Sequence, residues 1–301
     1  MAKTLSPSEL MVAADDTTRI KSNIDEYGMA VVTDVLSPEQ VKAVKSDLIA
    51  IADAERDARR EAYGDAVHED PVQYVRSLVG KGESFRSVIT DPLVLNLSRH
   101  ILGPDILLFG AMANRVPPGG PAGGTHTDQV FMPDEVTWPV VCGFVFMLDD
   151  FTDDNGATLV SPGSHRRALN ELTTESFAET AVSATGPAGS AIVMDGRVWH
   201  AIGKNTTTSS VRHSLLLFYS APYMRAKENW MFVTPPEVVR SASPELRALL
   251  GFKMWRSLGG PPAEGMTVGL AGVSSADGKP MNVNVDFGWA PQEPPWLTSP
   301  S

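Results

Sequence analysis

Short apolar runs separated by turn residues fill the middle of this chain. Clusters of Gly, Pro, Asn and Asp lie between the runs, a pattern typical of sandwiches and barrels of short strands rather than of a parallel α/β sheet. The expected strands are Ile106 to Val116, Val140 to Leu148, Thr158 to Ser161, Ser190 to Asp195 and Val211 to Ser220. Because the run from Val140 to Leu148 is apolar on both alternating faces, we expect a strand covered on both sides.

The first hundred residues follow a helical pattern instead. Ser37 to Gln40 form a capping box with proline in the first turn, which predicts a helix start. Apolar residues then recur at spacings of three and four, namely Val41, Val44, Leu48 and Ile51. Further helices are expected to begin at Ser6-Pro7 and at Asp91-Pro92, and a β-type run, Met29 to Thr33, separates the first helix from the second.

These patterns predict a mainly β (α+β) protein, a double-sheet jelly roll with a helical layer packed against it. We expect one domain over residues 1–301, since β-sandwiches of this size are often single domains. Residues 1–104 would form a mainly helical buttress, residues 105–221 the β core, and residues 222–301 a Pro- and Gly-rich C-terminal extension. One helix of that extension is expected to begin at Ser243-Pro244.

Composition narrows the class of protein. The chain is 43% hydrophobic, enough for a substantial core, and its net charge of −11 argues against a nucleic-acid partner, which would require clustered Lys and Arg. The run Val140 to Leu148 is about half of the ~20 residues that a membrane-spanning helix needs. No apolar signal-peptide core follows the N-terminus, and the single cysteine, Cys142, excludes an intramolecular disulfide. We expect a cytoplasmic protein with a small-molecule partner and Cys142 in its core; a homodimer is the candidate assembly.

The candidate chemistry begins at His126-Thr127-Asp128. In an extended segment, residues two apart point to one face, so His126 and Asp128 can converge on one metal ion, with His200 supplied by a distant strand. Two imidazoles and one carboxylate that leave coordination positions open are the ligand set of non-haem Fe(II) oxygenases. A His-x-Asp tripeptide by itself is also compatible with an ordinary surface turn.

A second candidate feature follows His200. The polar segment Lys204 to Thr208 is expected to be a turn, and a hairpin centred near Thr206 would place Arg212 directly opposite His200 on a shared face. Ser214 would lie on that face too. A guanidinium beside a hydroxyl is a good receptor for a carboxylate, although Arg212 taken alone is better interpreted as part of a structural ion pair.

As a set, these residues resemble the phytanoyl-CoA dioxygenase family of Fe(II)/2-oxoglutarate oxygenases. The resemblance covers about Ile24 to Ser220 and rests on the following motifs: His126-x-Asp128, Asn155-Gly156-Ala157-Thr158, Ser161-Pro162-Gly163-Ser164-His165, Trp199-His200 and Arg212-x-Ser214. It implies a double-stranded β-helix (jelly roll, cupin-like) that uses Fe(II), 2-oxoglutarate and O2. His126, Asp128 and His200 would hold the iron. The co-substrate would bind to Arg212, Thr158, Ser214 and Asn114.

The reaction expected from this resemblance is oxidation of a small, largely apolar metabolite, such as a secondary-metabolite intermediate, with release of succinate and CO2. Because the third ligand is Asp128 and not Ala or Gly, we expect hydroxylation, desaturation or rearrangement and not halogenation. Gln129, Phe131 and Met132 follow the ligand segment directly and are candidates for the substrate pocket. Two alternatives remain at this point, a Zn-dependent hydrolase or isomerase on the same fold and a non-catalytic metabolite-binding protein.

Four other residues carry weaker expectations. His165 is interpreted as a turn residue and not a ligand, and Trp199 as a core residue. His213 is expected to face away from Arg212, since neighbours on a strand point to opposite faces. Asp149 begins an acidic segment that is expected to be a solvated turn.

Overall fold

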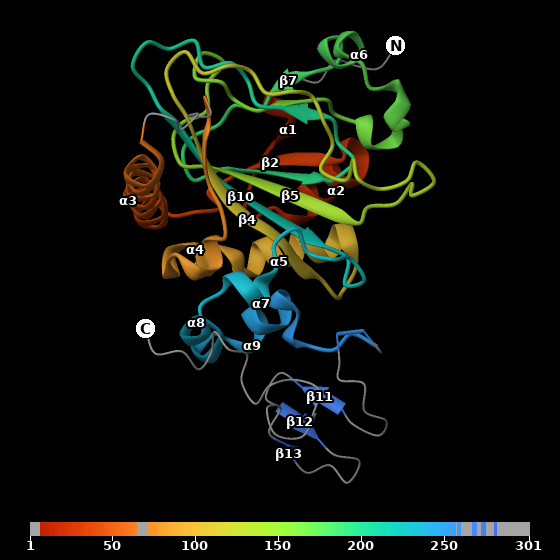
Figure 1. The fold of residues 1–301 in the computed structure, drawn as a ribbon. Helices are drawn as coiled ribbons and strands as arrows, with labels where there is room; N and C mark the ends of the chain where they lie inside the picture. The colour runs from red at the N-terminus through yellow and green to blue at the C-terminus, as the bar shows by residue number, and fades with distance from the viewer. Residues whose placement is uncertain are drawn as a thin grey trace.

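The computed structural model describes residues 7–64, 71–256 and 258–259 and three short strands farther along the chain. Two β-sheets and a layer of helices make up the main body (Figure 1). The larger sheet has seven strands in the order β1-β2-β8-β5-β10-β4-β3. Its strands are β1 (Met11–Ala13), β2 (Met29–Thr33), β8 (Ala191–Asp195), β5 (Val141–Met147), β10 (Arg212–Ser220), β4 (Leu107–Val116) and β3 (Gln73–Val75).

Only the β1–β2 pair of the large sheet is parallel; every other neighbouring pair is antiparallel. Every residue of β5 and β8 is buried, as the apolar run from Val140 to Leu148 predicted for β5. Cys142 of β5 is fully buried, and its burial raises the pKa of the thiol, so it is a core residue, as expected.

The smaller sheet has three strands in the order β7-β6-β9. They are β7 (Val182–Ser183), β6 (Leu159–Val160) and β9 (His200–Ala201). One apolar cluster joins the two sheets, because Met29, Val145 and Met194 of the large sheet belong to it together with Val160 of β6 and Val198 just before β9. The predicted double-stranded β-helix is therefore confirmed. The remaining strands, β11 (Thr267–Gly269), β12 (Gly272–Ser274) and β13 (Pro280–Met281), form a separate small sheet.

Helices cover the outer face of the large sheet, and in Figure 1 α4 and α5 lie beneath it while α3 lies at its side. The longer helices are α2 (Thr17–Tyr27), α3 (Pro38–Tyr63), α4 (Glu83–Ile89) and α5 (Pro92–Leu102). The predicted capping box of α3 is present, and the Asp91 carboxylate caps α5 by accepting the N–H groups of Leu93 and Val94. Local sequence was enough to place both starts, because a cap needs only neighbouring residues.

The remaining helices are short. They are α1 (Pro7–Leu10), α6 (Thr174–Ala178), α7 (Trp230–Val233), α8 (Pro236–Ser241) and α9 (Pro244–Arg247), with 3-10 turns at Leu78–Gly80, Ser164–Arg166 and Leu169–Glu171 and a π turn at Ala248–Phe252. Ser243 caps α9, as expected. Among the described residues, no helix has the length and apolar character needed to cross a membrane.

The N-terminal region begins a helix at Pro7, as expected, and contains more β-structure than the helical pattern indicated. The helix expected from Ser6-Pro7 ends after one turn at Leu10, because Met11–Ala13 pairs as a parallel strand with Val31–Thr33. The predicted β-type run Met29 to Thr33 is β2, and the region expected to be mainly helical supplies β1 and β3 to the large sheet as well. Long-range strand pairing, which periodicity along the chain does not show, decides both points.

Candidate active site

His200 is paired with His126 and not with Arg212. The two histidines are opposite each other on antiparallel segments, and each backbone N–H donates to the carbonyl of the other at 3.0 Å. Opposed residues in such a pair project their side chains to the same side, and the two imidazole centroids lie 4.3 Å apart. The predicted hairpin is wrong, since β9 belongs to the small sheet and β10 to the large one.

The segment between them crosses from one sheet to the other. Buried Asn205 anchors this crossing, because its side-chain amide donates to the carbonyls of Val116 and Ser210 at 3.2 and 2.8 Å. Its backbone also bridges to Asn155. His200 and Arg212 consequently approach the same space from opposite sheets.

Asp128 reaches this space beside Gly143 of β5. A Cβ built on Gly143 would lie 2.6 Å from Asp128 Oδ2, so any larger residue there would displace the carboxylate. Asp128 Oδ2 is buried and has no hydrogen-bond partner among the residues that the structure describes, while Oδ1 lies 3.7 Å from His200 Nε2. A buried carboxylate oxygen without a partner is costly, and an ion at this position would compensate it.

The donor atoms of His126, Asp128 and His200 fit a metal ion. They lie within 4.8 Å of one another, and no other metal-binding group of this kind occurs in the described residues. Nδ1 of each histidine contacts a backbone carbonyl, that of Gly124 or Val198, at 3.0 Å, which leaves Nε2 available as a ligand. Loss of hydration and the neighbouring His200 lower the pKa of His126, which favours the neutral imidazole that metal binding requires.

Arg212 is the most unusual charged residue of the site. It is 1% exposed, yet its only hydrogen bond in the described structure runs from Nη1 to the carbonyl of Gly156, at 2.5 Å, and Nε has no partner. Its guanidinium lies 4.7 Å from the ring centroid of Phe151. Burial lowers the pKa of Arg212 to about 10, which leaves the group charged at neutral pH. A buried cation without an anion fits the carboxylate of a ligand.

Neighbouring polar groups complete this receptor. Ser214 and Asn114 are paired across β10 and β4, and the Ser214 hydroxyl donates to the Asn114 side-chain oxygen. Thr158 is buried on the same cavity wall as Arg212. All four residues predicted for the co-substrate thus lie in one place, although the pairing that brings Arg212 there was predicted wrongly.

One cavity of about 400 Å3 contains the three candidate ligands and Arg212; we call it the active-site cavity. Leu216 and Phe218 of β10 line it, because residues two and four positions after Ser214 on a strand share its face. Of the three candidate substrate residues, Phe131 lines this cavity and stacks on Phe109 at 5.6 Å.

Gln129 and Met132 line a different space of about 500 Å3, which we call the rear cavity. It lies on the other side of residues 127–132, and its walls include His165, Arg166, Arg167 and Arg197. The Gln129 amide donates to the Trp138 carbonyl at 3.1 Å and accepts the Val140 N–H at 3.0 Å, so it holds the loop that follows Asp128.

His165 and His213 lie away from the metal ligands. His165 is in the rear cavity, and His213 faces away from Arg212 with Nδ1 2.8 Å from Asp149 Oδ2. Trp199 is buried against Phe177, which confirms its core interpretation. Asp149 is not simply solvated, since it also forms an ion pair with Lys45.

Sequence reasoning missed three contributors to the cavity. Gly143 gives Asp128 its space, Phe151 packs against Arg212, and Lys227 lines the cavity next to Phe218. A glycine within the apolar run of β5 was a usable signal, because glycine in a strand often marks close approach of another group. No local pattern distinguishes Lys227 from any other lysine.

Comparison with known proteins decides the family. The model of the family "Phytanoyl-CoA dioxygenase (PhyH)" matches residues 24–214. This chain belongs to the phytanoyl-CoA dioxygenase family. Dioxygenase af480 of Aspergillus fumigatus is 31% identical over 235 residues, covering 76% of this chain and 75% of that protein.

More distant relatives agree with this assignment. The iron/alpha-ketoglutarate-dependent dioxygenase ausU of Aspergillus calidoustus is 24% identical in an alignment that covers 85% of this chain and 86% of that protein. A crystal structure of the epimerase SnoN in complex with Fe3+, alpha ketoglutarate and nogalamycin RO has the same fold, with a TM-score of 0.51 and 17% identity. The match covers 68% of this chain and 83% of that one. Family membership and the His-Asp-His group make this chain an Fe(II)/2-oxoglutarate-dependent dioxygenase.

Proposed function

We propose that this dioxygenase oxidises a small, largely apolar metabolite, an intermediate of natural-product biosynthesis, by hydroxylation, desaturation or rearrangement. One observation carries the proposal: Arg212, a buried arginine that forms no ion pair with the described residues, lines the same cavity as a complete two-histidine, one-carboxylate group. The relative that binds nogalamycin in its crystal structure supports the natural-product class of substrate.

In this proposal His126, Asp128 and His200 hold the iron, and Gly143 leaves the space that lets Asp128 reach it. Arg212 binds the distal carboxylate of 2-oxoglutarate, with Thr158, Ser214 and Asn114 as its polar neighbours. When bound, Fe(II) and 2-oxoglutarate supply the oxidising chemistry, in which O2 is consumed, 2-oxoglutarate becomes succinate and CO2, and a substrate C–H bond is oxidised.

The residues of the chain orient the metal ligands and keep water out of the cavity. The carbonyls of Gly124 and Val198 fix the orientation of the two imidazoles through their Nδ1 atoms. Apolar side chains, among them Met194, Leu216 and Phe218, line the space around the ligands and exclude water from it. A ligand set that retains Asp128 has no vacated position for a halide, which supports hydroxylation or a related outcome over halogenation.

The direct test is formation of succinate and CO2 from 2-oxoglutarate by the full chain loaded with Fe(II). We expect turnover that depends on iron and 2-oxoglutarate and that fails with Zn(II) alone. Asp128→Ala and Arg212→Ala should each abolish it, and Asp134→Ala, in the rear cavity, is the matched control. Full turnover in either active-site variant, or a Zn(II)-dependent hydrolysis or isomerisation without 2-oxoglutarate, would overturn the proposal.

A further inference from the structure

A β-bulge in β4 forms part of the wall of the active-site cavity. This part contains neither the metal ligands nor Arg212. Phe218 pairs with Gly110 and Tyr219 with Leu108, so Phe109 is an extra residue without a partner on β10. Bulges beside active sites re-aim side chains and free backbone groups from the ladder. Two backbone groups at and beside this bulge hold another segment: Phe109 O accepts the Lys227 N–H at 2.8 Å, and the N–H of Ala111, which stays paired with Leu217, donates to Glu228 Oε1 at 2.9 Å.

This anchoring directs the Lys227 side chain into the cavity. Its Nζ lies 5.7 Å from the centroid of the Phe218 ring, and its Cδ lies 3.8 Å from the position of a Cβ on Gly110. The opposite edge of the Phe218 ring comes within 3.5 Å of the position of a Cβ on Gly143, where the Asp128 carboxylate is seated. One aromatic ring therefore separates the Lys227 ammonium from the metal ligands.

The active-site cavity has more positive than negative side chains. Its walls contain Arg76, Arg212 and Lys227, and Asp128 is their only acidic residue. Glu228, the acid next to Lys227, is not among the residues that line the cavity; its Oε1 accepts the Ala111 N–H, and its Oε2 is buried without a hydrogen-bond partner in the described part of the chain. Within the described part of the chain, no carboxylate pairs with Lys227.

The rest of the wall near Lys227 is apolar and aromatic. Phe109 and Phe131 stack on each other there, and Phe131 and Val130 are about half exposed at the cavity edge. Such a wall binds an apolar body, and a lysine at its end adds one fixed point of positive charge. The combination suits a molecule with a hydrocarbon frame and one anionic end.

We propose that the substrate carries a carboxylate on an apolar body and that Lys227 binds this carboxylate. The inference rests on the proposed function, because it takes Arg212 as the receptor for 2-oxoglutarate and leaves Lys227 for the substrate. Lys227 acts as a specificity residue: it fixes the charged end of the substrate, and the apolar body then extends past Phe218 toward the metal ligands.

The test uses the full chain with saturating 2-oxoglutarate and Fe(II) in the absence of O2. The probes are linear and alicyclic carboxylic acids, each compared with its methyl ester and with the primary amine of the same carbon skeleton. Binding is measured by calorimetry, and succinate release is measured afterwards in air. We expect the wild-type protein to bind the acids about tenfold to a hundredfold more tightly than their esters, the range for a hydrogen bond to a charged partner.

Variants of Lys227 identify the receptor. Lys227→Gln should remove the preference for the acid, Lys227→Arg should keep it, and Lys227→Glu should shift it to the amine. Lys42→Gln, on the exposed surface of α3, is the matched control and should behave as wild type. Arg212→Gln should retain the acid preference while it loses 2-oxoglutarate binding, since the two receptors are separate residues.

Two results would overturn the assignment. Equal binding of acids and esters by the wild-type protein would do so, and an acid preference that survives in Lys227→Gln would place the carboxylate elsewhere. Failure of the proposed function looks different, because the wild-type protein would then release no succinate from 2-oxoglutarate with any probe. Normal succinate formation without an acid preference would overturn the carboxylate assignment alone.

Discussion

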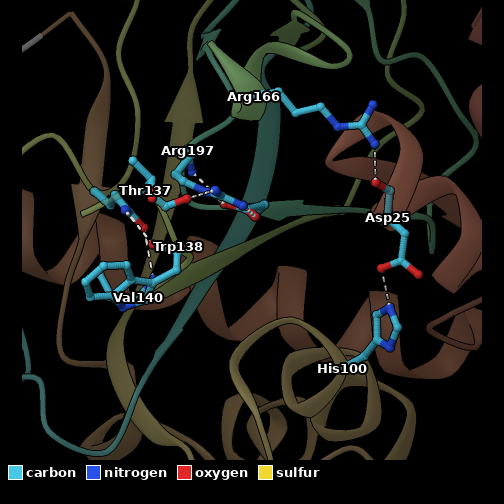
Figure 2. Close-up of polar contacts among 9 residues, drawn as sticks. Asp25, His100, Thr137, Trp138, Val140, Arg166 and Arg197 are labelled. Atoms are coloured by element: carbon cyan, nitrogen blue, oxygen red, sulfur yellow. Dashed lines mark hydrogen bonds and ion pairs between the residues drawn. The ribbon is translucent and has the colours of Figure 1, made fainter. Parts of the chain in front are cut away.

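Two cavities of similar size share one wall, residues 127–132, and differ in how their charges are satisfied. The rear cavity, of about 500 Å3, is lined by Arg166, Arg167 and Arg197. Figure 2 shows two of them engaged within the chain: Arg197 donates to the Thr137 carbonyl, and Arg166 donates to the Asp25 carbonyl at 2.7 Å. Arg197 also binds both carboxylate oxygens of Asp195, at 2.9 and 2.6 Å.

The active-site cavity, of about 400 Å3, has the opposite character. Among the described residues, Arg212 is buried without an ion-pair partner, and Asp128 Oδ2 is buried without a hydrogen-bond partner. Native proteins satisfy nearly all of their buried polar groups, so an unsatisfied pair of opposite charge in one cavity points to external ligands. The functional cavity differs from the structural one in whether its charged side chains have partners within the protein, more than in how many charged residues it contains.

The largest expected effect concerns the metal. Asp128→Ala removes one of the three ligands, and we expect Fe(II) affinity to fall by more than the 10- to 100-fold, roughly, that loss of an outer-shell partner costs. Iron content and Fe(II) titration measure this directly. Asp134→Ala in the rear cavity should leave iron binding unchanged, and equal effects of the two substitutions would contradict the comparison.

A matched pair of arginine variants tests the contrast between the cavities. Arg212→Gln should weaken 2-oxoglutarate binding about 100-fold, because a charge-assisted contact to a carboxylate is lost. Since no carboxylate of the described residues forms an ion pair with Arg212, the same change should leave the free energy of unfolding without ligands unchanged or higher.

Arg197→Gln should do the reverse. It leaves the Asp195 carboxylate, which is 7% exposed, without its guanidinium, and we expect a loss of about 2 kcal/mol in the free energy of unfolding. Urea denaturation measures this loss, and calorimetry should find the affinity for 2-oxoglutarate close to that of wild type. Exchange of these two outcomes between Arg212 and Arg197 would reverse the roles we assign to the cavities.

Gly143 allows a finer test of how the metal ligands are positioned. Gly143→Ala places a methyl group 2.6 Å from the present position of Asp128 Oδ2, so the carboxylate must move. We expect Fe(II) affinity to fall by roughly tenfold to thirtyfold, within the range of outer-shell changes. Gly110→Ala is the control, because a Cβ there meets its nearest neighbour at 3.6 Å, an ordinary contact.

The smallest expected effect concerns the pH dependence of stability and separates the two faces of β10. Burial raises the pKa of Asp149, but hydrogen bonds from His213 and Lys45 outweigh it and lower this pKa to about 2. A carboxyl whose folded pKa is below its unfolded value, 3.8, stabilises the fold above that value. We expect about 1–2 kcal/mol of the free energy of unfolding to be lost as pH falls from about 4 to 2.

Asp149→Asn should remove this dependence on pH while leaving 2-oxoglutarate affinity within a few-fold of wild type. Urea unfolding at a series of pH values checks the first part, and calorimetry the second. An unchanged pH profile in the variant would show that Asp149 is not the group responsible. The test also separates His213, whose Nδ1 contacts Asp149 within the protein, from its neighbour Arg212, to which we assign the co-substrate carboxylate.

Much of the fold and site could be predicted where the information is local. The helix starts at Ser37, Asp91 and Ser243 depend on a cap within three residues. His126 and Asp128 share a face because they are two residues apart in an extended segment. The predictions that were wrong depend on distant partners. The turn after His200 was expected to join paired strands, whereas hydrogen bonds of buried Asn205 hold it as a connection between the two sheets.

The candidate substrate residues show the same limit. Sequence proximity to Asp128 grouped Gln129, Phe131 and Met132 together, but the chain folds so that Phe131 faces the active-site cavity and the other two face the rear cavity. Lys227 lies far along the chain from the metal ligands, and a β-bulge at Phe109 brings it to the cavity. A bulge is a property of strand pairing, so no local sequence pattern predicts it.

The sequence by itself determined the chemistry of this protein: the family, the three ligand types and the arginine that follows them, because motif residues keep their identity wherever the chain places them. Tertiary structure alone decided which strands meet, which of two cavities each side chain enters, and which charges keep a partner inside the protein. Those outcomes depend on contacts between residues far apart in the chain. Such contacts form, and contribute to stability, only when the two sheets pack together.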